Sequence, residues 1–69
     1  MASYRFEIFK SSANNQYYWR FKAPNNEPMC QSEGYINKSG AEHAISVIKR
    51  EAASARVEDL TMASNALRF

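Results

Sequence analysis

Cysteine and histidine are almost absent from this sequence, which holds one of each, Cys30 and His43. A lone cysteine cannot form an intramolecular disulfide, and the two residues cannot supply the four ligands of a structural zinc site. A chain of 69 residues buries only about 60% of its unfolded surface, so a domain of this size needs a further source of stability. With disulfides and zinc excluded, the sequence favours oligomerisation as that source.

Long apolar runs are also lacking. No stretch approaches the roughly 20 apolar residues of a membrane span. The first ten residues, MASYRFEIFK, carry Arg5, Glu7 and Lys10 where a signal peptide would need an apolar segment. We therefore expect a cytoplasmic protein with no membrane partner. The net charge of +2, with acids and bases interspersed, is too small by itself to indicate a nucleic-acid partner.

Alternating residues predict two strands of a sheet. Residues 4–10 and 17–22 both place apolar side chains at every second position, the period of a half-buried strand. One face of the pair is apolar and consists of Tyr4, Phe6, Ile8, Tyr17, Trp19 and Phe21. The other face is mixed and carries Arg5, Glu7, Phe9, Tyr18, Arg20 and Lys22.

Two polar turns and a third strand complete the predicted sheet. Residues 11–16 (SSANNQ) favour a turn because Ser and Asn side chains bond the local backbone. In the second turn Pro24 fixes φ, and Asn25 and Asn26 tolerate positive φ. Residues 27–33 then form a third strand, which Pro28 restricts to a strand start or a sheet edge. The expected sheet is a three-stranded antiparallel meander.

A single helix is expected after the sheet. Ser39 and Glu42 match the S-x-x-E capping box, which places the helix start near Ser39. Val57 and Leu60 are expected to anchor a returning segment, followed by a loosely ordered or weakly docked tail at residues 62–69. The predicted fold class is α+β, with one β-β-β-α domain over residues 1–61. The helix would cover the sheet with a stripe of Ala41, Ala44, Ile45, Ile48 and Ala52.

Several short motifs resemble the YegP-like family of small uncharacterised bacterial proteins. They occur in the family's order and spacing: FEIFK at 6–10, WRFKA at 19–23, SEGY at 32–35, Lys38, Ala41, Ile45, Ile48, Lys49 and VEDLT at 57–61. The resemblance implies a ββ-β-α unit that occurs as a tandem repeat or as a single copy that pairs with itself. It implies no known activity. The chain departs from the family at Asn25-Asn26, where Asn-Gly is usual, at Pro28-Met29, where two aliphatic residues are usual, and at Ala44, where glycine is frequent.

The surplus of apolar side chains predicts a homodimer. One helix covers one face of a three-stranded sheet, and the face with Phe6, Ile8, Trp19 and Phe21 is the natural one. The other face still carries aromatics among charged residues, as a partner interface does. The predicted dimer interface consists of Phe9, Tyr18, Met29 and Val47. The competing interpretation is that these aromatics lie under Arg and Lys stems and face only water.

Single-stranded nucleic acid is the alternative partner. Phe9 and Tyr18 would stack bases beside Arg20 and Lys22, which would contact phosphates, as in other sheet-type binders. No ribonucleoprotein-type signature accompanies these residues. The acids Glu7 and Glu33 would interrupt the positive strip.

No catalytic centre is predicted, and we expect no enzyme, cofactor or metal. His43 lies opposite the apolar helix stripe, where a solvated residue belongs. Cys30 is expected to be a small buried hydrophobe. Glu58 and Asp59 are adjacent on an extended segment and point in opposite directions, so we expect them to cap or form ion pairs. The SEGY motif is expected to be a structural corner, with Gly34 providing backbone freedom and Tyr35 packing.

Overall fold

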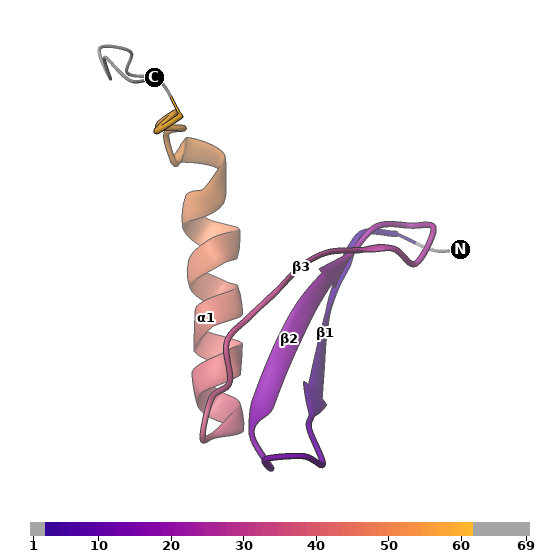
Figure 1. The fold of residues 1–69 in the computed structure, drawn as a ribbon. Helices are drawn as coiled ribbons and strands as arrows, with labels where there is room; N and C mark the ends of the chain where they lie inside the picture. Colours follow the sequence, from indigo (N-terminus) through magenta and orange to yellow (C-terminus); the bar gives the residue numbers. More distant parts are fainter. Residues whose placement is uncertain (1–2, 62–69) are drawn as a thin grey trace.

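Three antiparallel strands form one sheet, and a single helix stands against it (Figure 1). The computed structural model describes residues 3–61, so the expected tail at 62–69 lies outside the described residues. The strands are β1 (Arg5–Lys10), β2 (Tyr17–Lys22) and β3 (Pro28–Gln31), with β2 in the centre. The helix α1 (Lys38–Glu51) continues into a short 3-10 turn, η1 (Ala52–Ser54). The β-β-β-α prediction is confirmed.

The pairing of β1 with β2 separates two chemically different faces. Ile8 lies opposite Trp19 and Phe9 opposite Tyr18, so the alternation of the sequence holds across both strands. The side of the sheet that faces α1 is called the inner face; it carries Phe6, Ile8, Lys10, Tyr17, Trp19 and Phe21. The opposite side is called the outer face; it carries Arg5, Glu7, Phe9, Tyr18, Arg20 and Lys22.

Both predicted turns form, and asparagine supplies the unusual backbone geometry in each. Asn15 has a φ of 59° and Asn26 a φ of 71°, the left-handed conformation that Asn tolerates better than most residues. Asn25 does not adopt positive φ; its side-chain oxygen instead accepts the Glu27 N–H at 3.1 Å. The positive φ at Asn26 gives a physical reason for the Asn-Gly that the family resemblance implies at this turn.

β3 is shorter than the predicted strand at 27–33. Pro28 opens it at the edge of the sheet, as expected for a residue that cannot donate to the ladder. The register with β2 shifts between Phe21 and Lys22, since Phe21 faces Cys30 whereas Lys22 faces Pro28. Met29 is the extra residue at this irregularity and is 61% exposed.

The predicted capping box at Ser39 and Glu42 is wrong. α1 begins at Lys38 with Asn37 as its N-cap, and no side chain caps it. The reason lies upstream: Tyr35 is fixed to β2 because its N–H and C=O both bond to Tyr17, each at 2.8 Å. The chain therefore enters the helix directly after this bridge, which places Ser39 inside the first turn instead of at the cap.

Gly34 serves close packing and not backbone freedom, which corrects the sequence-based expectation. Neither glycine has positive φ. A Cβ on Gly34 would collide with the Gln16 side-chain oxygen and lie 3.0 Å from the Tyr18 hydroxyl oxygen. A Cβ on Gly40 would meet only Tyr35, at 3.3 Å from Cδ1, which confirms that Tyr35 packs in this corner.

The fully buried core is small. Within residues 3–61, only Trp19, at 7% exposure, and Ala41, at 0%, are buried hydrophobic residues. Ala44, Ile45 and Ile48 are half-buried, as the predicted stripe requires, whereas Ala52 lies exposed in η1. The helix thus sits on the central strand without sealing the sheet beneath it.

We expect Gly34→Ala to destabilise the fold by about 1 kcal/mol, because the Gln16 side chain can rotate away, whereas the Tyr18 ring, which is stacked on Phe9, must shift. Gly40→Ala is the matched control. Its contact with Tyr35 is looser and is offset by the higher helix propensity of Ala, about 1 kcal/mol. Urea unfolding followed by circular dichroism measures both changes. An equal or larger loss at Gly40 would contradict this account of the corner.

Candidate functional site

The inner face is only partly covered by α1. Ile8 is 37% exposed although it points toward the helix, and Phe6 and Phe21 are half-buried. A hollow of about 180 Å³ remains between the sheet and the second half of α1, and its lining is entirely apolar in character, with Phe6, Trp19, Phe21, Cys30, Ile48 and Ala52. An apolar hollow of this kind loses dispersion contacts that a well-packed core would make.

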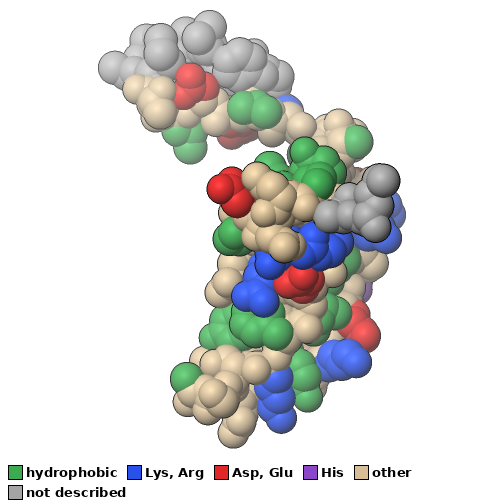
Figure 2. Space-filling view, turned by 90° about the vertical axis from the view of Figure 1, so that its right-hand side faces the viewer, with side chains coloured by type: hydrophobic (Ala, Val, Ile, Leu, Met, Phe, Trp, Pro, Cys, Tyr) green, Lys and Arg blue, Asp and Glu red, His purple; other side chains and the backbone are tan. Residues whose placement is uncertain are grey.

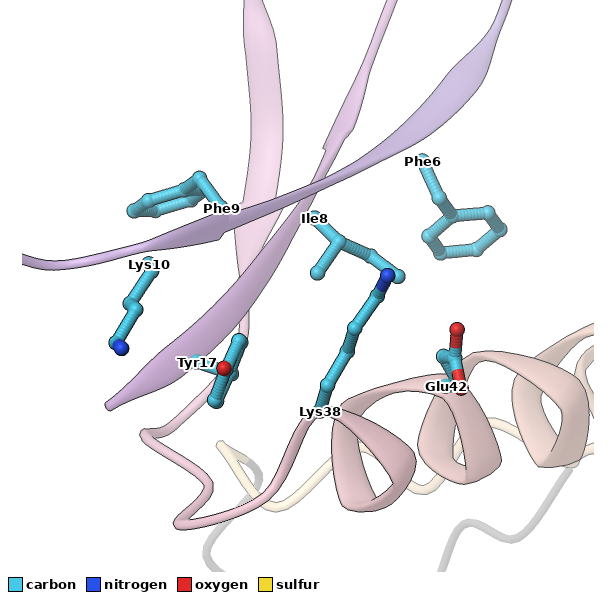
Figure 3. A pocket seen from close by; sticks show the side chains of 7 residues that line it. All are labelled: Phe6, Ile8, Phe9, Lys10, Tyr17, Lys38 and Glu42. Atoms are coloured by element: carbon cyan, nitrogen blue, oxygen red, sulfur yellow. The ribbon is translucent and has the colours of Figure 1, made fainter. Parts of the chain in front are cut away.

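A second hollow lies between β1 and the start of α1 (Figure 3). This groove has a volume of about 600 Å³ and is lined by Phe6, Ile8, Phe9, Lys10, Tyr17, Lys38 and Glu42. Lys10, at the end of β1, and Lys38, at the start of α1, both border the groove. The Lys10 ammonium lies 5.4 Å from the centre of the Tyr17 ring. Because β1 is an edge strand, the groove runs along a row of unpaired backbone groups.

The segment after η1 exposes apolar side chains. Val57 is 69% exposed and Leu60 is 80% exposed, so neither anchors the chain to its own sheet as the sequence led us to expect. In Figure 1 the described part of this segment runs past the end of α1, away from the sheet. Glu58 pairs with Arg56 at 2.6 Å, and Asp59 accepts the Thr61 N–H at 2.9 Å. These bonds are local, in agreement with the predicted capping and ion-pairing roles of the two acids.

The outer face is organised around one carboxylate. Glu7 accepts a hydrogen bond from Arg5 Nε at 2.9 Å and from Arg20 Nε at 3.1 Å, and Lys22 Nζ lies 3.8 Å away. The three cations lower the pKa of the Glu7 carboxyl, chiefly through the hydrogen bond from Arg20. Figure 2 looks onto the sheet side of the molecule and shows Lys and Arg side chains gathered around an acidic one.

An aromatic pair adjoins this cluster. The Phe9 and Tyr18 rings are stacked, with centroids 5.7 Å apart and planes at 16°. The Arg20 guanidinium lies 4.5 Å from the Phe9 ring centre, a cation–π distance. Asn14 Nδ2 donates to the Tyr18 hydroxyl at 2.8 Å, which holds that ring in place. The outer face therefore carries an ordered aromatic stack beside a cluster of cations.

The predicted interface residues do not form one surface. Phe9 and Tyr18 lie together on the outer face, whereas Met29 lies beyond the opposite end of β2. Val47 lies on α1, on the other side of the sheet. For the nucleic-acid alternative, the structure brings all four residues together: Phe9, Tyr18, Arg20 and Lys22 share the outer face.

The groove residues Lys10, Lys38 and Glu42 were not identified as a site from the sequence. A signal existed for Lys10, because the period of two places it on the same face as Ile8. The approach of α1 to the edge strand, which brings Lys38 and Glu42 to that groove, is a tertiary contact that no local pattern specifies.

The reactive residues stand apart from any cluster. His43 is exposed on α1, as predicted, but Cys30 is exposed on β3, and the prediction that it is buried is wrong. β3 is an edge strand with all four residues exposed, and this explains the difference. No group of three or more His, Cys, Asp or Glu within residues 3–61 is arranged to hold a metal ion. Neither helical segment in the same range has the length and apolar character that crossing a membrane needs.

Known proteins of similar sequence share this unit. Residues 12–59 match the family described as Domain of unknown function (DUF1508). The UPF0339 protein Atu0232 of Agrobacterium fabrum is 52% identical over 58 residues, which cover 84% of this chain and 92% of that protein. The UPF0339 protein Msl4696 of Mesorhizobium japonicum is 46% identical over 57 residues, covering 83% of this chain and 95% of that protein.

A solved structure shows the same fold. The NMR solution structure of a protein from Haloferax volcanii superposes with a TM-score of 0.73 at 33% identity, covering 86% of this chain and 98% of that one. The sequence match, the relatives and the fold agree with the motifs noted in the sequence. The chain belongs to the DUF1508 family of uncharacterised UPF0339 proteins, and its YegP-like resemblance is confirmed.

Proposed function

We propose that this chain is one half of a homodimer, a binding or structural module without catalytic activity, in which a second copy completes the inner face. The observation that carries the proposal is the incomplete core, with Trp19 and Ala41 as the only buried hydrophobic residues within residues 3–61. Phe6, Ile8 and Phe21 remain open on the face that the helix should cover. Burying such surface against a second copy would stabilise the dimer by roughly 25 cal/mol for each Å² of apolar area removed from water.

The segment at 56–60 is the part of the second copy that fits the groove best. Val57 and Leu60 offer apolar side chains to a floor that contains Ile8. Glu58 and Asp59 lie between them and match the positive charge of Lys10 and Lys38. The backbone enters this segment extended, with φ −70° and ψ 134° at Ala55, and turns at residues 60–61, so the segment would dock through its side chains and not as a regular strand on β1. Reciprocal exchange of the segment between two copies gives a closed two-fold dimer.

The surroundings of the reactive residues support a non-catalytic role. Among the described residues, the His43 side chain makes no hydrogen bond or ion pair with a carboxylate that would orient it as a general base, and the Cys30 thiol makes no hydrogen bond with a Lys, Arg or His that would stabilise a thiolate. A free, exposed thiol at Cys30 also suits a reducing compartment, which supports a cytoplasmic location.

We expect Leu60→Glu to convert the dimer to monomer or to raise its dissociation constant at least tenfold. Leu60 is 80% exposed in the single chain, so a glutamate there disturbs the fold of one copy very little. Ile36→Glu is the matched control, because Ile36 is equally exposed at 79% and lies outside the proposed contact. Light scattering coupled to size exclusion measures the mass. A wild-type monomer, or equal behaviour of the two variants, would refute the exchange.

One residue from each side of the sheet distinguishes the two faces. We expect Ile8→Glu to weaken self-association and Tyr18→Glu to leave it intact, since Ile8 lines the groove on the inner face whereas Tyr18 lies on the outer face, away from the groove. Analytical ultracentrifugation over a concentration series gives both constants, and circular dichroism reports whether each variant folds. The reverse pattern, with only Tyr18→Glu monomeric, would move the interface to the outer face.

A further inference from the structure

We propose that the outer face binds single-stranded nucleic acid, with phosphates held by Arg5, Arg20 and Lys22 and a base stacked beside Tyr18. This face is separate from the proposed dimer contact except at Phe9, which also lines the groove, since the rest of the groove and the apolar hollow lie on the side of the sheet that faces α1. No described element covers it: the two strands present their outward side chains as one continuous surface (Figure 2).

Charge is concentrated on this face. Arg5, Arg20 and Lys22 are balanced there by Glu7 alone, which leaves two positive charges. That excess equals the net charge of the whole chain, +2, so the other charged residues cancel one another. A local positive excess attracts a phosphate backbone even where the net charge of a protein is small.

The cluster retains donors for a ligand. Glu7 engages the Nε atoms of Arg5 and Arg20, and among the described residues the terminal guanidinium nitrogens of Arg20 have no hydrogen-bond partner. Lys22 lies at 3.8 Å from the carboxylate, a distance that leaves its ammonium donors available. The acid therefore orders Arg20 and Lys22 and leaves donors on both. Arg5, whose terminal nitrogens donate to the Ser3 carbonyl and the Asn26 side-chain oxygen, adds its charge to the strip, so Glu7 does not interrupt it.

The aromatic pair favours nucleic acid over other anions. Phe9 and Tyr18 are stacked with nearly parallel planes, and the Arg20 guanidinium lies over the Phe9 ring, so the three groups form a short stack. Bases stack on aromatic rings and on guanidinium planes, with about 1–3 kcal/mol for each base on an aromatic ring. An acidic peptide would use the cations but gain little from an aromatic stack. A membrane surface would require apolar side chains free to insert, and both rings are half-buried.

The test uses the full chain and a fluorescein-labelled oligothymidylate of 12 nucleotides, followed by fluorescence anisotropy. We expect binding at 20 mM salt that weakens about 100-fold at 200 mM, the dependence for three phosphate contacts on a single strand. Tyr18→Ala should weaken binding roughly tenfold, from lost stacking. Tyr18→Phe keeps the ring and should bind within about twofold of the wild type, which separates stacking from the hydrogen bond to Asn14.

Charge variants of equal net charge locate the site. Lys22→Gln and Lys49→Gln each remove one positive charge, but Lys49 lies on α1. We expect Lys22→Gln to weaken binding about fivefold or more, Lys49→Gln to leave it unchanged, and Glu7→Gln to strengthen it, since one phosphate contact changes affinity severalfold at low salt. Equal losses at Lys22 and Lys49, equal affinity for duplex DNA, equal competition by polyglutamate, or no binding at 20 mM salt would each overturn the proposal.

Discussion

The structure depends on how one short helix packs against the central strand of a three-stranded sheet. The 14 residues of α1 lie on β2, and this contact buries Trp19 and Ala41 while leaving the ends of the inner face open. The contact is also imperfect, because the indole nitrogen of Trp19 is buried without a hydrogen-bond partner among the described residues. A buried unsatisfied donor costs about 1–3 kcal/mol. A core this small leaves little stability in reserve, which is why the open inner face matters more than any single reactive residue.

The period of two in β1 and β2 produces two surfaces with different chemistry from the same twelve residues. Inward side chains other than Lys10 are apolar or aromatic and are incompletely covered, so their further burial is favourable. Outward side chains satisfy one another: Glu7 organises the cations, and Arg20 lies over Phe9. The sequence-based expectation located the surplus apolar surface on the outer side. In the structure Phe9 and Tyr18 are half-buried on the outer side, and on the inner side Ile8 is 37% exposed and an apolar hollow lies beside Ile48.

Local patterns predicted most of the fold because the interactions that form it are local. Strand alternation, asparagine-rich turns and the apolar stripe of α1 act within a few residues, and each of these predictions was confirmed. The failures have tertiary causes. The helix cap moved to Asn37 because Tyr35 is bonded to Tyr17, and Gly34 is required by side chains that arrive from β2 and the preceding turn. The ion cluster and the groove could not be specified from sequence either, since both depend on register and on the position of α1 relative to β1.

Several similar proteins are about as long as one β-β-β-α unit. This chain covers 92% of the Agrobacterium fabrum protein and 98% of the Haloferax volcanii structure, so each of those proteins is about one such unit long. The family resemblance also implies tandem copies in other members, and both arrangements address the same physical problem. A covalent second copy raises the effective concentration of the partner to the millimolar range. If the proposed homodimer forms, the stability of a single-copy chain depends on its own concentration, because folding and assembly are then linked equilibria. A ligand of the outer face would meet two cationic surfaces in each such dimer, so binding and dimer formation would be coupled without a change of shape.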